Sequence, residues 1–183
     1  AYTVKDRENE IELDIENEYI MSPKDLCTIE FIDKMADAGV SVFKIEGRAR
    51  SAEYVKKASH AYKTAITAVE NGSFSQEMAS SLKAELSEVF NRGFWDGYYQ
   101  GARLGQWSEV YGSKATKKKV YIGKITNYFS NIGVAEVLIE SSELCKGDNV
   151  LIIGPSTGVI ELKVNEIRVD LKETDKAIKG EYC

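Results

Sequence analysis

The feature that most constrains the fold is a change in the spacing of apolar residues at a lysine-rich stretch, residues 114–119. Before this stretch, apolar residues recur every three or four positions, as on the buried side of a helix. After it, they alternate over short runs separated by glycine-rich turns, as in half-buried strands. Two periodicities in one chain predict two structural units, which we place at residues 1–116 and 117–183.

The sequence predicts an α/β arrangement of strands and helices in the first unit. A hairpin is expected over 2–15, strands at 18–21 and 40–46, and helices from Pro23 to Gly39, over 51–69 and over 74–90. Strand, helix, strand, helix in this order predicts a parallel strand pair with a right-handed crossover. Such a pair is covered on both faces in complete α/β folds. We therefore expect the chain to be part of a longer protein, and to self-associate when isolated.

The second unit is expected to be all-β. Short strands are predicted at residues 120–128, 134–139, 150–153, 159–167 and 177–182. Many short strands without helices indicate a small closed antiparallel barrel, because closure removes exposed strand edges.

Composition narrows the function classes. Three cysteines are too few for a disulfide framework and fit a reducing, cytoplasmic setting. The apolar runs are far shorter than the ~20 residues that cross a bilayer, so we expect no membrane partner. A net charge of −5 argues against a freestanding nucleic-acid binder, which usually carries a basic stripe, although a local basic patch is compatible with it.

The segment from Lys44 to Ser51 carries the densest chemistry. On a strand, Lys44 and Glu46 share one face. A Lys and a Glu that face inward at the end of a parallel strand, followed by arginines, form the arrangement that α/β barrels use for substrate sites. Glu46 would act as a general base, Lys44 would pair with it or bind an anion, and Arg48 would clamp a carboxylate or phosphate. The alternative is a structural Lys–Glu pair with solvated arginines.

Two further side chains are candidate reactive groups. Cys27 falls in the first turn of the helix expected from Pro23, where the helix dipole would lower the pKa of a thiol. It is either a metal ligand, a reactive thiol or a small buried residue. His60 is the single histidine, and a surface or packing role suits it better than catalysis, so no nucleophile–histidine pair is predicted.

A glycine-rich aromatic segment spans residues 92–101 and contains Phe94, Trp95, Tyr98 and Tyr99. Its rings would either pack two domains together or stack on nucleobases. The lysines at 117–119 would form a solvated linker or touch a phosphate backbone.

Two motifs resemble a known family. The sequences YIMSPKDLC at 19–27 and GVSVFKIEGRARS at 39–51, followed by Tyr54 and Val55, resemble the closing part of the catalytic domain in the peptidase U32 (collagenase-like protease) family over about residues 1–112. The sequences LCKGDNV at 144–150 and VNEI at 164–167 resemble the second-domain barrel of translation elongation factors.

The resemblance implies the truncated end of a TIM-like α/β barrel followed by that small barrel. It implies substrate binding by Arg48, Arg50, Ser51 and Tyr54, and it makes Cys27 a candidate ligand of an iron–sulfur cluster whose other cysteines would lie in the longer parent protein. Relatives with these motifs act in tRNA hydroxylation, forming 5-hydroxyuridine at the wobble position with prephenate, a small dicarboxylate, as a requirement. Others carry a protease or collagenase label. The alternatives are therefore RNA modification, peptide hydrolysis and a binding module without activity.

Overall fold

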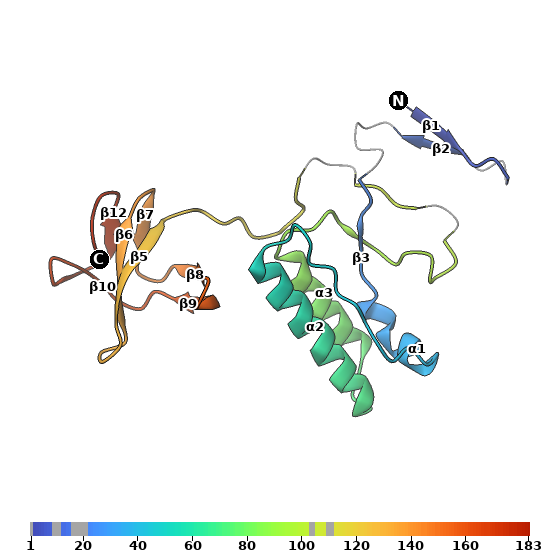
Figure 1. Cartoon of the computed structure of the whole chain (residues 1–183), viewed down its shortest axis with the longest axis horizontal. Coiled ribbons are helices and arrows are strands. Elements are labelled where there is room, and N and C mark those ends of the chain that lie inside the picture. Colours follow the sequence, from blue (N-terminus) through green and yellow to red (C-terminus); the bar gives the residue numbers. More distant parts are fainter. Residues whose placement is uncertain (1, 9–11, 16–21, 103–104, 109–111) are drawn as a thin grey trace. The chain divides into compact units, whose positions relative to one another are not determined.

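The computed structural model describes residues 2–8, 12–15, 22–102, 105–108 and 112–183 (Figure 1). The chain divides into two compact units, Ala1–Lys117 and Lys118–Cys183, and the division falls inside the lysine-rich stretch. The first unit mixes helices and strands, and the second contains strands joined by turns.

The first unit begins with the expected hairpin. Strands β1 (Tyr2–Lys5) and β2 (Glu12–Ile15) pair antiparallel, from Tyr2 opposite Ile15 to Lys5 opposite Glu12. Polar and apolar residues alternate along the sequence of both strands. The strand expected at 18–21 lies outside the described residues.

Two helices form the body of the first unit, as the sequence predicts. Helix α2 (Ala52–Glu70) begins after Ser51, whose hydroxyl accepts a hydrogen bond from the Tyr54 N–H at 3.3 Å. Helix α3 (Gln76–Ser87) begins after Ser75, whose hydroxyl accepts from the Met78 N–H at 3.2 Å. Both serines satisfy amides of the first turn that have no partner inside the helix.

The core of this unit lies where α2 and α3 face each other. The buried side of α2 is a stripe of alanines at helical spacing, Ala58, Ala61, Ala65 and Ala68. Helix α3 packs Leu82 and Leu86 against this stripe, and small side chains on one helix allow the leucines of the other to approach closely. Cys27, Ile29 and Ile32 complete the same buried cluster.

The helix expected from Pro23 is wrong in its beginning. Residues Asp25–Leu26 form strand β3, a 3-10 turn follows at Ile29–Phe31, and helix α1 spans only Ile32–Asp37. The amides that would open a helix donate instead to distant carbonyls: Lys24 to Gln106, Asp25 to Gly93 and Cys27 to Trp95. Strand β4 (Phe94–Trp95) thereby pairs parallel with β3. The predicted stop is correct, because Gly39 has a left-handed φ of 88°.

The strand expected at 40–46 is also wrong. The segment forms no strand and pairs with none of the described strands. Phe43 and Ile45 still pack against the core, while Val42, the residue before Phe43, is 82% exposed. The side-chain alternation of a strand is therefore present without the pairing, and the parallel pair in the described part of this unit is β3 with β4.

The second unit is built from hairpins and short pairs. Its strands are β5 (Gly123–Phe129), β6 (Val134–Ile139), β7 (Glu143–Cys145), β8 (Asn149–Gly154), β9 (Gly158–Lys163), β10 (Ile167–Val169), β11 (Lys172–Thr174) and β12 (Lys176–Ile178). They pair antiparallel as β5 with β6, β8 with β9, β10 with β11, and β7 with β12. Three of the pairs supply a small core of Ile139, Leu144, Ile167 and Ala177, and Val150 of β8 packs against it.

The closed barrel that we expected here is not formed. Closure requires each strand to be hydrogen-bonded along both edges, whereas every sheet in residues 118–183 has two strands. Further backbone hydrogen bonds connect the pairs. Strand β6 and residues 180–183 exchange several, among them the Ile139 N–H to the Glu181 carbonyl at 2.9 Å, and the Gly147 N–H donates to the Val164 carbonyl at 2.7 Å. The unit is therefore a set of antiparallel ribbons around one core.

Among the described helices, none has both the length and the apolar character that a membrane span requires.

Gly123 provides a test of the β5–β6 pairing. A Cβ at this position would lie 1.9 Å from the carbonyl oxygen of Leu138, a backbone atom that cannot move aside cheaply. We expect Gly123→Ala to lower the free energy of unfolding of the second unit by about 3 kcal/mol. Gly154→Ala is the matched control, because its Cβ would meet Thr157 at an ordinary 3.4 Å. Urea denaturation with hydrogen exchange of the β5 and β6 amides measures both, and equal losses would contradict the packing described here.

Candidate functional site

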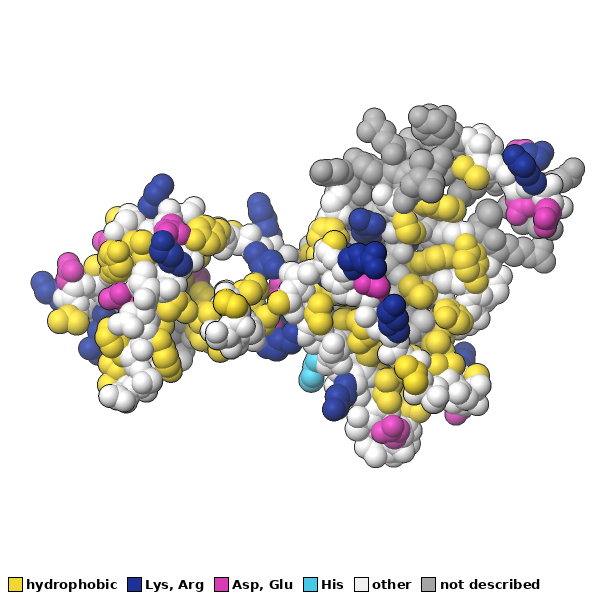
Figure 2. All heavy atoms as spheres, viewed as in Figure 1, with side chains coloured by type: hydrophobic (Ala, Val, Ile, Leu, Met, Phe, Trp, Pro, Cys, Tyr) yellow, Lys and Arg dark blue, Asp and Glu magenta, His cyan; other side chains and the backbone are white. Residues whose placement is uncertain are grey.

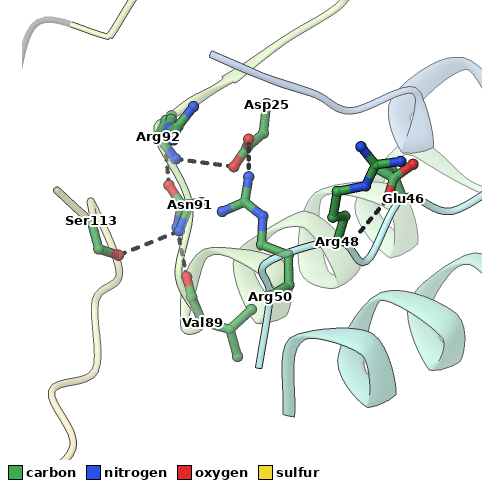
Figure 3. Close-up of polar contacts among 9 residues, drawn as sticks. Asp25, Glu46, Arg48, Arg50, Val89, Asn91, Arg92 and Ser113 are labelled. Carbon is green, nitrogen blue, oxygen red and sulfur yellow. Dashed lines mark hydrogen bonds and ion pairs between the residues drawn. The ribbon is translucent and has the colours of Figure 1, made fainter. Parts of the chain in front are cut away.

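An ion pair between Arg50 and Asp25 lies at the centre of the first unit. The Arg50 Nη2 is 2.5 Å from the Asp25 Oδ1, and the two side chains are only 14% and 15% exposed. The other oxygen of Asp25 accepts a hydrogen bond from the Arg92 N–H at 3.1 Å (Figure 3). One carboxylate thus joins strand β3, the start of α2 and the chain that enters β4.

Aromatic rings surround the guanidinium of Arg50. Its Cζ lies 5.1 Å from the ring centroid of Tyr54 and 4.9 Å from that of Phe90, both within the range of cation–π attraction. The Arg50 Nη1 is buried and has no hydrogen-bond partner among the described residues. Arg50 is therefore held in one orientation by a carboxylate and two rings, with one donor unused.

Ser51 and Tyr54, the other predicted substrate-binding residues, lie beside Arg50 on the first turn of α2. The Ser51 hydroxyl serves as the helix cap. Burial raises the pKa of the Tyr54 hydroxyl above its ordinary value, and the positive charge of Arg50 opposes that rise. The phenol therefore stays protonated near neutral pH and can donate a hydrogen bond.

The predicted catalytic residues face solvent. Lys44 and Glu46 are exposed, as is the predicted substrate-binding residue Arg48, whereas Phe43 and Ile45, which alternate with Lys44 and Glu46, are half-buried. The Glu46 Oε1 accepts a hydrogen bond from the Arg48 N–H at 2.8 Å, which folds the carboxylate back on its own turn (Figure 3). Lys44 and Glu46 do share a face, but the described residues of this chain do not enclose them in the inward-facing pocket that we expected.

Cys27 is a buried residue of the core. It is 4% exposed, and the Tyr62 hydroxyl lies 3.9 Å from its Sγ. The same hydroxyl accepts a hydrogen bond from the Thr28 N–H at 2.9 Å. Burial raises the pKa of the Cys27 thiol and raises the pKa of Tyr62 to about 12. The expected lowering of the thiol pKa by a helix dipole is wrong, because Cys27 follows β3 and precedes the helix.

The residues of this chain do not by themselves fit an iron–sulfur cluster. Cys27 is the single cysteine of the first unit, and no three His, Cys, Asp or Glu side chains gather as metal ligands in the described part of the chain. The predicted ligand role of Cys27 depends on cysteines from outside this sequence.

Sequence reasoning missed Asp25 and Asn91. Asp25 lies in the segment where a helix was expected to begin, and its actual partner Arg50 lies 25 positions away. Asn91 is 2% exposed; its amide group donates to the Val89 carbonyl at 2.9 Å, and its Oδ1 accepts from the Gly93 N–H at 3.0 Å. A polar residue between Phe90 and Arg92 gives no signal of burial. The sequence contains both Asp25 and Arg50, but their spacing does not indicate that the two side chains pair.

The helical unit with its buried Arg–Asp pair and exposed charged segment is the part of the chain that a known family covers. Residues 1–109 match the model of Peptidase family U32. The chain belongs to this family, as the motifs at 19–27 and 39–51 predict.

Relatives carry two kinds of name. The chain is 59% identical over 181 residues to a protein of Porphyromonas gingivalis named Collagenase, covering 99% of this chain and 44% of that protein. It is 36% identical over 173 residues to an uncharacterized protease of Methanocaldococcus jannaschii, covering 93% and 42%. It is 27% identical over 164 residues to tRNA hydroxylation protein P of Haemophilus influenzae, covering 89% and 35%. The chain spans less than half the length of these three relatives. No solved structure matches it.

Removal of the Asp25 carboxylate tests the central ion pair. Asp25→Ala leaves the charge of Arg50 half-buried without its partner, and we expect the free energy of unfolding to fall by about 3 kcal/mol. Asp25→Asn keeps an acceptor for the Arg92 N–H and should cost less. Glu166→Gln is the control, since the Arg168–Glu166 pair is 61% and 52% exposed and exposed pairs contribute little. An equally small effect of all three changes in urea denaturation would show that the pair is not structural.

Thiol labelling tests the environment of Cys27. In the native protein near neutral pH, we expect iodoacetamide to modify Cys27 roughly tenfold or more slowly than Cys145, which is half-buried. Because the pKa of Cys27 is raised, its labelling rate should keep rising as the pH passes the ordinary value for a thiol. Mass spectrometry of the peptides measures both rates, and in denaturant they should converge. Equal rates in the folded protein would contradict the burial of Cys27.

Proposed function

We propose that the longer protein to which this chain corresponds acts in hydroxylation of tRNA at the wobble uridine. The observation that carries this proposal is the extent of the similarity to a protein named for tRNA hydroxylation. It covers 164 residues, so it reaches across both structural units and is not confined to the helical one. In this proposal the first unit is the end of a TIM-like barrel whose remaining strands lie elsewhere in the longer protein.

The charged segment supports a role for an anionic partner. Lys44 and Arg48 place two cations on the exposed side of one short stretch, with the Glu46 carboxylate between them. A small dicarboxylate would engage the two cations, and Glu46 would act as the general base. Arg50, Ser51 and Tyr54 follow directly and would complete the substrate-binding set. If an iron–sulfur cluster is present in the longer protein, Cys27 would be one of its ligands.

Peptide hydrolysis is the second candidate. It is favoured by the 59% identity to a protein named Collagenase. Against it stands the chemistry of the described residues: Cys27 is buried with a raised pKa, the Ser51 hydroxyl is used as a helix cap, and His60 is exposed on α2. None of these forms the nucleophile–base pair that covalent hydrolysis requires. A binding module without activity is the third candidate.

Modification profiling of tRNA tests the proposal. In a strain that lacks the gene, we expect wobble 5-hydroxyuridine to be lost, and the full-length gene should restore it. A gene that carries Glu46→Gln should restore about 100-fold less 5-hydroxyuridine or lower still, because a general base raises the rate by a factor of about 10²–10⁴. Glu85→Gln, a change at an exposed glutamate of α3, should restore the modification fully.

The same variants distinguish peptide hydrolysis. If the purified full-length protein digests gelatin or casein, loses this activity on Glu46→Gln, and the deletion strain keeps normal wobble uridines, then RNA modification is wrong and the second candidate is right. A full-length protein that neither cleaves peptides nor affects the wobble uridine would leave the binding module as the answer.

A further inference from the structure

The outer face of the β3–β4 pair differs from the face that forms the ion pair. Asp25 lies opposite Phe94, and Leu26 lies opposite Trp95. Asp25 pairs with Arg50 and Phe94 packs against the core, so these positions face inward. Because side chains alternate along a strand, Lys24, Leu26, Gly93 and Trp95 belong to the opposite face. That face plays no part in the site described above.

The carboxyl end of this face carries an aromatic hollow. It has a volume of about 390 Å³ and is lined by Leu26, Trp95, Gly97, Tyr98 and Tyr99. Tyr98 and Tyr99 are each 62% exposed, and Leu26 is 54% exposed. The rings are held in place: Tyr98 meets Trp95 edge-on with centroids 5.3 Å apart, and Tyr99 lies 6.0 Å from Phe31.

Gly97 keeps the hollow open. Its φ is +65°, and a Cβ there would lie 2.8 Å from the Leu26 Cδ1 and 3.4 Å from the Tyr99 ring. Any larger residue would push into the space between these side chains. Several ordered aromatic and aliphatic groups exposed together mark a surface that a partner covers.

Two lysines converge on the neighbouring end of the same face. A Cβ added to Gly93 would lie 3.5 Å from the Lys114 Cδ, 3.7 Å from the Lys114 Nζ and 3.7 Å from the Lys24 Cδ. Both lysine side chains therefore pass over this glycine. The Lys24 Nζ donates to the Gln106 Oε1 at 3.0 Å, and this neutral acceptor leaves the ammonium charge uncompensated by that bond. In Figure 2, lysine and arginine side chains adjoin apolar ones on the visible face of the unit that contains α2 and α3.

The spacing suits a nucleotide. Positions 24 and 26 are two residues apart on a strand, or roughly 7 Å, which brings the Lys24 ammonium group and the aromatic hollow within reach of one phosphate and its base. Proteins that bind single strands combine cations along the backbone with rings on which bases stack. An apolar protein segment would use the hollow but would not need the lysines beside it.

We propose that this face binds single-stranded RNA, with a base stacked in the aromatic hollow and the adjoining phosphate beside Lys24. The proposal rests on the proposed function, because it names where the RNA substrate of that reaction touches the chain. The acidic net charge limits the contact to this local patch.

Fluorescence anisotropy of this chain with a short fluorescein-labelled oligouridine RNA tests the proposal. We expect the double change Tyr98→Ala and Tyr99→Ala to weaken binding at least about tenfold, since stacking on each base contributes ~1–3 kcal/mol. The double change to Phe keeps both rings and should bind as the unchanged chain does. Lys24→Gln should reduce the slope of log affinity against log salt by about 0.7, the value for one phosphate contact on a single strand.

The controls separate stacking from packing. The double change to Leu keeps apolar contacts but removes the rings, so it should lose affinity as the alanine variant does, with an unchanged circular dichroism spectrum. Val42→Ala, a change at an apolar residue 82% exposed on the 40–46 segment, should not affect binding. Unchanged affinity in the alanine or leucine variants, an unchanged salt slope for Lys24→Gln, or no binding by the unaltered chain would each overturn the proposal. Wobble-uridine profiling is independent of this assay, so failure of the RNA face and failure of the proposed function are distinguishable.

Discussion

The structure of the first unit depends on one carboxylate. Asp25 neutralises the Arg50 guanidinium and also accepts the Arg92 amide, so it joins three segments that are far apart in the chain. Arg50 directly precedes the Ser51 cap of α2, and Asp25 lies in β3. A half-buried ion pair contributes little net stability by itself, but removal of one member leaves a charge without compensation. The pair therefore fixes how the strand pair meets the helices.

That arrangement also connects the two surfaces to which we assign function. The exposed segment with Lys44, Glu46 and Arg48 ends two residues before Arg50, and the outer face with Lys24 and Leu26 flanks Asp25 on both sides. The same ion pair thus sets the distance between the candidate catalytic side chains and the candidate RNA face.

Local sequence signals predicted the two long helices and the antiparallel strands of the second unit well, and the segments at Pro23 and at 40–46 poorly. Ser51 and Gly39 mark helix ends by chemistry that acts within one turn, and in the structure one helix begins directly after Ser51 and another ends just before Gly39. Whether the segments at Pro23 and at 40–46 form strands depends on distant partners. Gly93 and Trp95 supply the carbonyls that make the first segment a strand, whereas the second segment pairs with no strand in the described part of the chain. For the same reason, the ion pair between Arg50 and Asp25 was not predicted.

The connection between the units is short and fixed at one end. The Thr116 amide donates to the Ser87 carbonyl, and Lys117 pairs with Glu88, whose pKa is held below its ordinary value by hydrogen bonds from Lys117 and Lys57. The first unit therefore holds the chain as far as residue 117, and β5 begins at Gly123. Exposed joints of this kind tolerate insertion and exchange. A connection of this kind allows the whole ribbon unit to be replaced, duplicated or lost in evolution while the helical core keeps its structure.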